Sequence, residues 1–471
     1  MTQLEREDVQ GLVFSGYAAM HEARYLFYEV ADPAGARRWL GELAARVTTG
    51  SAGEGAHCTN VALTHRGLAA LGLDPEPLGT FAPPFQEGMT TPYRQRVLGD
   101  VGPSAPDMWA WGGPPGSDSS APEDRLHVLL LLFAPDGPAM DSLLDAEMSR
   151  ATAEGALRHL QTLQPEPLPG TISAGKFGVE HFGFADGMSQ PVIQGTGQED
   201  ELAGEQARRH VVATGEFVLG YPNGYGELTP SPWLPGPDSG KVDLGRNGTY
   251  LVVRQLKQDV HGFRQLVRRL AGTVGDDADA EARFAAKLVG RWYSGAPLAR
   301  TPHRDDVDLA TDNAFGYAEV DPYGERCPLG AHIRRANPRD STAPERARAL
   351  ELTNLHRILR RGRVYGPGLP DAATEDDLVE RGLIFICMSA NIERQFEFVQ
   401  QTWCNNPKFS GLYEEQDPVL GTPPPEGGLF TVQGSPFATR ARGLTNFVTV
   451  RGGAYFFLPG VRGLLSLAGR S

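Results

Sequence analysis

The stretch RYLFYEVADPAGARRWLGELAARV, from Arg24 to Val47, sets the architecture expected for the whole chain. Its beginning, up to Val30, is rich in aromatic and β-branched residues and predicts a strand. Asp32 stands where a helix N-cap belongs, and Pro33 takes the first helical position. One helical face collects the apolar residues spaced i, i+3, i+4 and i+7, namely Leu40, Leu43, Ala44 and Val47. The stretch therefore predicts a strand followed at once by a helix.

Strands and helices alternate in the same way through the rest of the chain. We expect strands at 127–135, 248–256, 382–388 and 447–460, and helices at 140–163, 259–272 and 391–403. The glycine- and proline-rich segment from about Phe81 to Asp124 is expected to be a loop. Because helices join few, mainly nonconsecutive strands, the pattern favours the α+β class with two domains. We place the boundary near residues 205–215, in the polar segment GQEDELAGEQARRH, which gives domains 1–210 and 211–471.

The size and composition are those of an ordinary globular protein. With 471 residues the chain exceeds one typical core, which supports two domains. Its 40% hydrophobic and 22% charged residues fall in the usual globular range. The formal net charge of -14 argues against nucleic acid and against an anionic membrane surface as partners.

The termini, apolar runs and cysteines indicate the cellular setting. The beginning, MTQLEREDVQ, has neither a basic nor an apolar export region, so we expect a cytoplasmic protein. The longest purely apolar run, Val128 to Ala134, is too short to span a bilayer, so we expect no membrane association. Cys58, Cys327, Cys387 and Cys404 are widely spaced without a CxxC pair. They are expected to be reduced rather than bridged or zinc-bound.

The segment HFGFADGMSQP, His181 to Pro191, places one carboxylate, Asp186, among apolar residues and glycines. Asp before glycine is a common turn pair, and Gly183 and Gly187 permit backbone angles that other residues avoid. An ordinary turn is therefore one interpretation. A carboxylate held in a mostly apolar setting is the other, because such a group can move protons.

The segment CPLGAHIRRANPR, Cys327 to Arg339, surrounds one histidine with arginines. His332 can ligate a metal through one ring nitrogen while an acceptor fixes the other nitrogen. The neighbouring Arg334 and Arg339 can clamp an anionic ligand. A solvated basic loop with an incidental histidine is the alternative.

A third segment, LHRILRRGRVYGPG, from Leu355 to Gly368, is also rich in arginine. Its periodicity decides neither helix nor strand, and its end, RVYGPG from Arg363 to Gly368, is expected to be a turn. A solvated face is again the alternative. Nucleotide-binding GxGxxG and GKS/GKT patterns, the HExxH zinc motif and the GxSxG elbow are absent from the sequence.

Taken in order, these three segments resemble the dye-decolorizing (DyP-type) family of heme peroxidases. GFADG matches its GxxDG motif, AHIRRANPR the stretch with its proximal histidine, and RILRRGRVYG the stretch with its distal arginine. Similar segments at VQGLVFSGY, LVGRWYSGAPL and GLIFICMSANIERQFEFVQQTW extend the resemblance over nearly the whole chain. The length and the NIERQFEF segment favour the larger subfamily, called class C or V. The resemblance implies two ferredoxin-like domains with antiparallel sheets and peripheral helices, and one noncovalent heme b held mainly by the second.

The resemblance also implies roles for individual residues. His332 becomes the axial iron ligand, Asp186 the distal carboxylate and Arg360 the distal arginine, with Arg357 or Arg361 as alternatives. Gly187 and Gly183 let the backbone approach the porphyrin. The remaining heme-binding residues are an apolar distal pair, two propionate contacts and a partner for the proximal histidine: Leu383 with Phe385, Arg334 with Arg339, and Asn391 or Glu393.

The implied activity is reduction of hydrogen peroxide with oxidation of an organic donor such as a dye or phenolic compound. Asp186 would move the proton from one peroxide oxygen to the other, and Arg360 would stabilise the developing negative charge. Bulky donors would give up electrons at surface Tyr or Trp, with Trp109, Trp111, Trp233, Trp292 and Trp403 as candidates. The alternatives are a noncatalytic heme carrier or sensor, a heme enzyme of another type such as a deferrochelatase, and a structural protein. Neither the donor nor the oligomeric state is indicated by the sequence.

Overall fold

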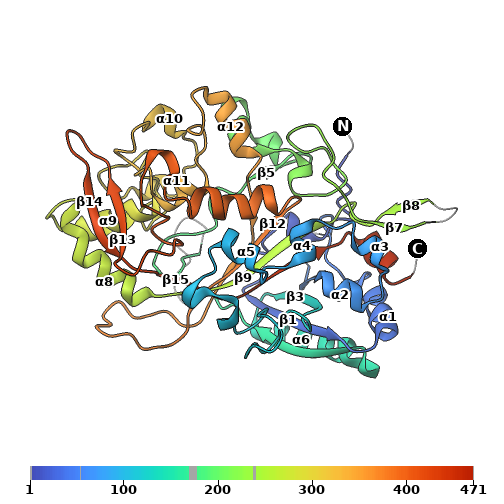
Figure 1. Ribbon diagram of the computed structural model, residues 1–471. Coiled ribbons are helices and arrows are strands. Elements are labelled where there is room, and N and C mark those ends of the chain that lie inside the picture. The colour runs from blue at the N-terminus through green and yellow to red at the C-terminus, as the bar shows by residue number, and fades with distance from the viewer. Residues whose placement is uncertain (1–2, 53–54, 169–177, 237–239, 470–471) are drawn as a thin grey trace.

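The computed structural model describes residues 3–52, 55–168, 178–236 and 240–469 (Figure 1). Within these ranges one large antiparallel sheet forms the centre of the molecule. Its strands are β1 (Glu22–Val30), β2 (Cys58–Leu63), β3 (Val128–Ala134), β4 (Leu157–Leu163), β9 (Thr249–Gln258), β10 (Leu359–Arg360), β11 (Arg363–Tyr365), β12 (Gly382–Ser389) and β15 (Val448–Leu458). They lie in the order β10-β12-β9-β15-β2-β3-β1-β4, and β11 also pairs with β12.

The two ends of this sheet repeat one arrangement. In the second half, β10 and β11 pair with successive parts of β12 and are counted as one strand. Counted within each half of the chain, the strand order is then fourth, first, third, second: β4-β1-β3-β2 in one half and β15-β9-β12-β10 in the other. The halves meet where β15 pairs with β2, at Phe457 opposite Leu63. The α+β class with antiparallel strands, expected from the sequence, is confirmed.

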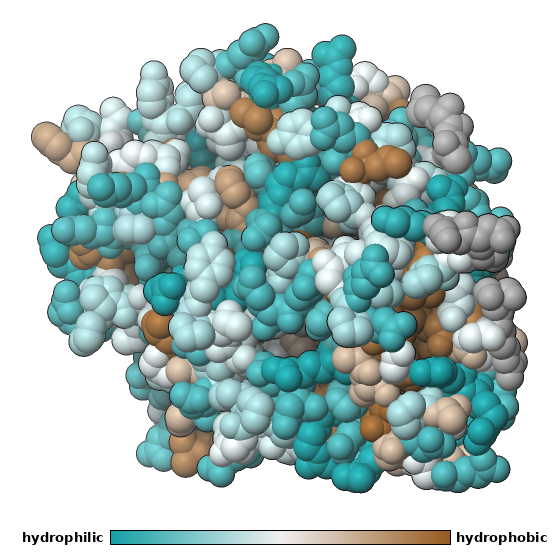
Figure 2. Space-filling view, turned by 45° about the vertical axis from the view of Figure 1, so that its right-hand side comes forward, coloured by the Kyte–Doolittle hydropathy of each residue, from teal (hydrophilic) through white to brown (hydrophobic). Residues whose placement is uncertain are grey.

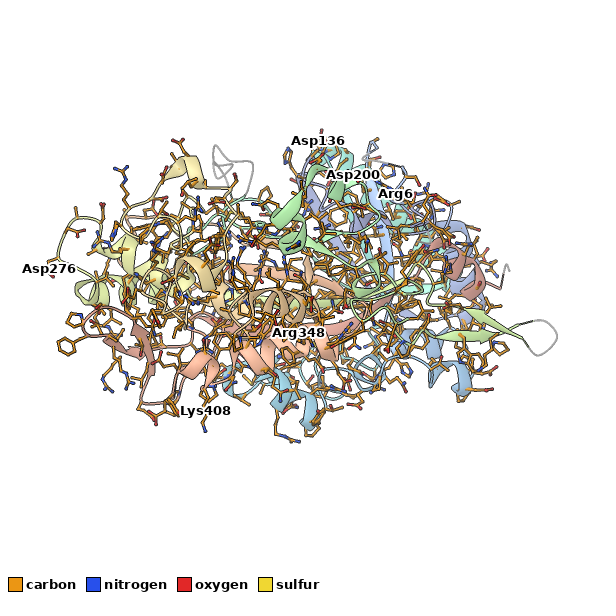
Figure 3. The ribbon with its side chains drawn as sticks, turned by 90° about the horizontal axis from the view of Figure 1, so that it is seen from above. Arg6, Asp136, Asp200, Asp276, Arg348 and Lys408 are labelled. Atoms are coloured by element: carbon orange, nitrogen blue, oxygen red, sulfur yellow. The ribbon has the colours of Figure 1, made fainter. Side chains whose placement is uncertain are left out.

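The remaining elements cover the sheet faces and the two ends of the molecule. The helices are α1 (Pro33–Leu43), α2 (His65–Ala70), α3 (Pro75–Leu78), α4 (Pro83–Glu87), α5 (Pro92–Leu98), α6 (Gly137–Thr152), α7 (Gly204–His210), α8 (Val260–Leu270), α9 (Ala280–Val289), α10 (Tyr317–Val320), α11 (His332–Ala336), α12 (Arg346–Asn354) and α13 (Val461–Leu467). Small two-stranded sheets pair β5 (Val192–Ile193) with β6 (Val211–Val212), β7 (Trp233–Pro235) with β8 (Lys241–Asp243), and β13 (Gly428–Val432) with β14 (Thr439–Leu444). From above, the molecule is elongated, with Asp276 at one end (Figure 3).

The apolar run in β3 shows why the sheet is central. Leu130 and Leu132 belong to the core shared with α1 and α6 on one face. Leu129, Leu131 and Phe133 belong to the core on the other face. A strand buried on both faces has no polar side to alternate with, which explains the continuous leucines. The face of the molecule seen in Figure 2 is covered mainly by hydrophilic residues.

Several local predictions are confirmed at residue level. Asp32 caps α1 by accepting hydrogen bonds from the N–H groups of Ala34 and Gly35, and Pro33 is the first helical residue. The strands expected near 127–135, 248–256, 382–388 and 447–460 are β3, β9, β12 and β15. None of the four cysteines forms a disulfide bond, as expected, and all four are buried.

Other local predictions were wrong for identifiable reasons. The helix expected at 140–163 ends at Thr152, because Glu154 and Gly155 have positive φ angles of 52° and 73° that reverse the chain. The segment after this reversal is β4, an edge strand paired with β1. The loop expected between Phe81 and Asp124 contains α4 and α5, both of which begin with proline. Arg363–Tyr365, expected to lie in a turn, is β11.

The helix expected at 391–403 is present. Two parts of it, Glu393–Glu397 and Val399–Cys404, have π-helical hydrogen bonding, and together they are called the π-helical segment. A π-helix is rare and is often found at functional sites. None of the described helices is both long and apolar enough to cross a bilayer.

Candidate active site

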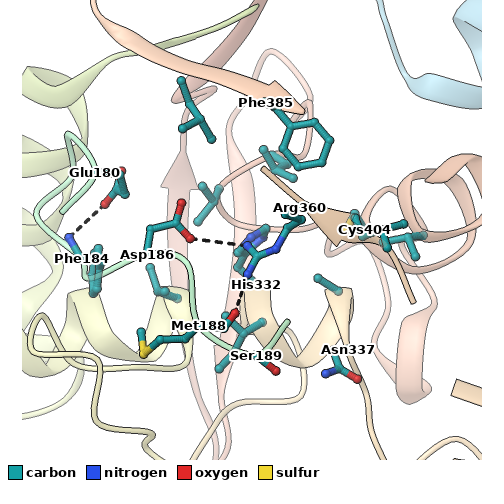
Figure 4. Close-up of a pocket in the computed structure, with 18 of the residues that line it drawn as sticks. Glu180, Phe184, Asp186, Met188, Ser189, His332, Asn337, Arg360, Phe385 and Cys404 are labelled. Atoms are coloured by element: carbon teal, nitrogen blue, oxygen red, sulfur yellow. Dashed lines mark hydrogen bonds and ion pairs between the residues drawn. The ribbon is translucent and has the colours of Figure 1, made fainter. Parts of the chain in front are cut away.

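The three segments singled out in the sequence meet at one cavity (Figure 4). The cavity measures about 270 Å³ and lies among α11, β12, the π-helical segment and the loop that carries Asp186. His332, Asp186 and Arg360 all line it, although they lie far apart in sequence. Its walls are largely apolar, which is typical of a cofactor or small-molecule site.

His332 is held in one orientation by a carboxylate. Its Nδ1 lies 2.8 Å from Oδ2 of Asp417, whose side chain is fully buried. An ionised carboxylate can only accept, so Nδ1 carries a hydrogen, and in the neutral ring Nε2 keeps a free lone pair. Among the described residues, Nε2 has no hydrogen-bond partner. Burial by itself lowers the pKa of His332, but the Asp417 carboxylate outweighs it and raises that pKa above its usual value.

The expectation that Asn391 or Glu393 is the hydrogen-bond partner of His332 was wrong. The Asn391 side chain instead accepts the Arg394 N–H at 2.9 Å, and Glu393 forms an ion pair with Arg94 at 3.4 Å. Asp417 follows the π-helical segment in a loop, where its Oδ1 also accepts backbone N–H groups of the next turn. In sequence, Asp417 before Pro418 indicates only a turn.

Asp186 and Arg360 form a pair on the cavity wall. Nη1 of Arg360 lies 3.5 Å from Oδ1 of Asp186, and both side chains remain about one-third exposed, at 34% and 38%. The Gly187 N–H donates to the same Oδ1 at 2.6 Å, and Arg360 Nη2 donates to the Met188 carbonyl at 2.7 Å. A cation and a carboxylate therefore face the same space, and both keep polar atoms available.

The turn interpretation of this loop also holds. Gly183 and Gly187 have φ angles of 101° and 92°, in the region that favours glycine. A side chain at Gly183 would also approach the Tyr293 ring at 3.4 Å. Gly187 does not line the cavity, and its contribution to the site is the backbone N–H that binds Asp186.

The register of the arginine-rich segment is decided by β10. Side chains alternate between the faces of a strand, so Arg360 faces the cavity while its neighbours face away. Arg361 donates instead to the carbonyls of Leu12 and Val13 on the opposite side. Arg357 lines the cavity as well, but its Nη2 donates to the Ser189 carbonyl at 2.7 Å. Arg360 is thus the arginine beside Asp186.

The expectation that Arg334 contacts a cofactor anion was wrong. Its guanidinium donates to the Asp321 carboxylate at 3.0 Å and to the Cys327 carbonyl at 2.7 Å, and it lies outside the cavity lining. Residues two apart on a helix point in different directions, so His332 and Arg334 of α11 cannot share a face. Arg339 does line the cavity, as expected.

Three arginines instead form a cationic group at the cavity: Arg291, Arg339 and Arg357. Burial and the charges of Arg339 and Arg360 lower the pKa of Arg357 to about 9. Burial and the charge of Arg339 likewise lower the pKa of Arg291 to about 10. Among the described residues, Arg357 has no ion pair. Charges crowded in this way call for an anion, and sequence reasoning missed Arg291 and proposed Arg357 only for another role.

The apolar wall comes from β12 and the π-helical segment. Leu383 and Phe385 both line the cavity, as expected, while the intervening Ile384 packs into the core behind the strand. The π-helical segment adds Phe396, Val399 and Cys404 to the lining. Glu180 lies in the same wall and was not predicted, although it immediately precedes HFGFADG in the sequence.

Most of the tryptophans considered as surface relays are internal. Trp109, Trp111 and Trp292 are at most 2% exposed, and Trp403 is 7% exposed. Trp233 is partly exposed, and the Lys241 Nζ lies over its ring, 3.8 Å from the ring centroid. Of these five, Trp233 alone combines partial exposure with a place on a projecting hairpin (Figure 1).

Known proteins resemble this chain in sequence and structure, although no protein-family model matches it. Peroxidase 2 of Mycetinis scorodonius is 30% identical over 501 residues, covering 97% of this chain and 86% of the relative. Multifunctional dye peroxidase DyP2 of Amycolatopsis sp. is 32% identical over 359 residues, covering 72% and 70%. A solved structure of an ancestral D-type dye decolorizing peroxidase superposes with a TM-score of 0.79 at 26% identity, covering 98% and 99%.

Proposed function

The chain belongs to the dye-decolorizing peroxidase family, and we propose that its cavity holds one noncovalent heme b at which hydrogen peroxide is reduced while an organic donor is oxidised. The protein is therefore a peroxidase. The identity of its cofactor, the class of its donor and the role of each residue are our proposal. Dyes and phenolic compounds are the donor classes we propose. The observation that carries the proposal is the Asp186–Arg360 pair, at 3.5 Å, in the same cavity as the carboxylate-held His332.

The residues present suit heme. One neutral histidine with a free Nε2 lone pair is the donor set that heme iron takes from a protein on one side. Arg339 and Arg357 are crowded by like charges, and neither forms an ion pair with a described residue, so they suit the two propionates. Leu383, Phe385 and the π-helical residues suit the apolar ring system.

The side chains divide the remaining work. Bound heme supplies the redox centre that takes oxidising equivalents from peroxide and passes them to the donor. Asp186, when ionised, accepts a proton from one peroxide oxygen and returns it to the other. Arg360, always charged, stabilises the negative charge that develops on the leaving oxygen. His332 is kept in orientation by Asp417, and the apolar wall limits the space to small molecules.

We also propose that the chain is built from two ferredoxin-like units, 1–210 and 211–471. The support is the strand order, which follows the same fourth, first, third, second pattern in each half. Phe182 and Phe184, in the first range by sequence, pack on Phe263 of the second. The loop carrying Asp186 would thus reach across to the heme-binding unit.

The test is rapid mixing of the heme-loaded protein with hydrogen peroxide, followed by absorbance of the Soret band. We expect a fast, peroxide-dependent spectral change that an added dye or phenol reverses. The His332→Ala protein should retain much less heme or show a shifted Soret band. A heme-loaded wild-type protein that does not respond to peroxide, or a His332→Ala protein with unchanged heme content and spectrum, would contradict the proposal.

A further inference from the structure

Glu180 is a second carboxylate in the wall of the cavity, beside the loop that carries Asp186. The peroxidase chemistry proposed above gives it no task. A carboxylate in a mostly apolar wall costs free energy unless hydrogen bonds or charges compensate it. Its contacts therefore indicate what it does.

Both oxygens of Glu180 accept hydrogen bonds from its own loop. Oε2 accepts the Phe182 N–H at 2.9 Å, and Oε1 accepts the Phe184 N–H at 3.0 Å. From the neighbouring strand β9, Gln258 Nε2 donates to Oε2 at 2.6 Å. The backbone closes the same turn, because the Gly183 N–H donates to the Glu180 carbonyl at 2.8 Å. Glu180 therefore ties the turn together and fastens it to the central sheet.

Aromatic packing fixes the opposite side of this turn. The Phe182 ring lies 4.5 Å from the Phe263 ring of α8, measured between centroids. The Phe184 ring lies 4.5 Å from the Tyr293 ring. Phe182 and Phe184 thus bind Glu180 through their N–H groups and pack into the core through their rings. The turn is therefore held from both sides.

The turn leads directly to the distal carboxylate. The Ala185 N–H donates to the Tyr293 carbonyl at 3.1 Å, and the Asp186 N–H donates to the Gly178 carbonyl at 2.9 Å. Asp186 is only partly buried and reaches Arg360 at 3.5 Å, so its own side chain contributes little to fixing its position. Its position depends on the backbone that precedes it.

We infer that Glu180 is a positioning residue, which clamps the turn 180–184 so that the Asp186 carboxylate stays beside Arg360 and faces the bound peroxide. The inference rests on the proposed peroxidase function. It assigns Glu180 no contact with peroxide or heme. Because misplacing a catalytic group by about 1 Å can cost roughly 100-fold in rate, a clamp of this kind has a measurable consequence.

The burial of Glu180 is consistent with this assignment. Burial, with a smaller contribution from the Asp186 charge, raises the pKa of Glu180 to about 7, against the three hydrogen bonds that lower it. Its other titratable neighbour is the Tyr293 hydroxyl. No guanidinium or ammonium group of the described residues forms an ion pair with Glu180. The carboxylate is thus held by N–H donors rather than by a cation.

The test compares Glu180→Gln with the wild-type protein, both loaded with heme. Glutamine keeps the size but replaces one acceptor oxygen by a donor, which opposes one of the two loop N–H groups. We expect unchanged heme content and Soret maximum, a peroxide reaction slowed roughly 10- to 100-fold, and faster hydrogen exchange at the Phe182 and Phe184 amides. Gln258→Met removes one donor to Glu180 and should give a smaller change in the same direction, which covers the case that Glu180→Gln does not fold.

A double-mutant cycle separates positioning from general damage. In an Asp186→Asn background, Glu180→Gln should slow the peroxide reaction no further, because the group it positions is already absent. The control is Glu216→Gln, since Glu216 is a buried carboxylate outside the cavity lining that accepts a loop N–H, from Gly224 at 2.9 Å, and also pairs with Arg394 at 2.6 Å. This control should leave the rate unchanged.

The outcomes distinguish the two proposals. A wild-type protein that ignores peroxide would contradict the proposed function, while faster exchange at the two amides would still support the clamp. A responsive wild type with an equally fast Glu180→Gln protein would overturn the clamp alone. So would a loss in Glu180→Gln that adds in full to the loss in Asp186→Asn, because it would mark general structural damage.

Discussion

Asp417 lies 2.8 Å from Nδ1 of His332, although 85 positions separate the two residues in the chain. The carboxylate is held in turn by the Val419 and Leu420 N–H groups at 2.9 Å, so it cannot follow a rotating ring. Burial raises the pKa of Asp417, but its interaction with His332, the hydrogen bond from the Leu420 N–H and the Arg335 charge outweigh it, and the pKa falls below its usual value. An ionised, fixed acceptor on one side of the ring dictates where Nε2 points.

Replacing Asp417 with alanine should therefore weaken heme binding without removing the iron ligand. Loss of such a partner typically costs 10- to 100-fold in affinity of the metal group, and we expect a loss of about that size. Heme titration followed at the Soret band measures it. Asp321→Ala serves as a control, because Asp321 pairs with Arg334 outside the cavity. Equal heme affinity in the Asp417→Ala and wild-type proteins would contradict the role given to Asp417.

The two arginines of the LHRILRRGRVYGPG segment should differ in what they do. Arg360 lies beside Asp186, whereas Arg357 belongs to the cationic group with Arg339. Arg360→Leu should keep its heme and slow the peroxide reaction about 10²- to 10³-fold, the usual loss for one donor to a developing negative charge. Arg357→Leu should lower heme affinity instead, because it removes a cation proposed to face a propionate. Stopped-flow rates and heme titrations on both variants measure this. Exchanged phenotypes would mean that the roles are reversed.

Local patterns in the sequence were sufficient for most strands of the sheet. The N-cap at Asp32, the apolar run in β3 and the apolar face of α8 are short-range signals, and each structure formed where expected. The end of α6 was missed because the apolar spacing in the sequence continues into β4, whereas the positive φ angles of Glu154 and Gly155 end the helix. Strand pairing across the sheet joins distant segments such as β15 and β2, and no local pattern encodes it.

The candidate site divides in the same way. His332, Asp186 and Arg360 were predicted by family resemblance, and the structure brings them to one cavity. Asp417 was missed because an Asp-Pro pair in a sequence indicates only a turn. It does not indicate that one carboxylate oxygen binds a histidine from a distant segment. Arg334 was misplaced because neighbours in sequence diverge on a helix. Glu180 was missed because its role consists of hydrogen bonds to its own backbone.

Asp186→Asn tests the proton transfer itself. Asparagine has nearly the same shape and can still accept the Gly187 N–H, but it cannot take up a proton from peroxide. General base catalysis contributes about 10²- to 10⁴-fold, so we expect the Soret change after peroxide mixing to slow by that factor with heme content unchanged. Stopped-flow rates across pH, for both proteins, provide the measurement. Identical rates and pH profiles would leave Asp186 an ordinary turn residue.

The last prediction concerns how folding stability depends on pH through Glu180. Its pKa in the folded protein is raised to about 7, from a usual value of 4.5, chiefly by burial. Well below pH 4.5 the group is protonated in both states and has no effect. As the pH rises from 4.5 through 7, the unfolded chain ionises while the folded protein still holds the proton, so the free energy of unfolding decreases. Above 7 both states are ionised, and this loss becomes constant.

Glu180→Gln abolishes this titration and should flatten the decline. We expect the heme-loaded wild type to lose more stability than Glu180→Gln between pH 5 and 8, as measured by urea unfolding at each pH. Glu201→Gln, a substitution at an exposed carboxylate, serves as the control and should follow the wild-type curve. Because peroxide is absent from this experiment, its result depends only on where Glu180 is buried and what it binds. Parallel pH curves for wild type and Glu180→Gln would show that Glu180 ionises as freely in the folded protein as in the unfolded chain, which its position in the cavity wall argues against.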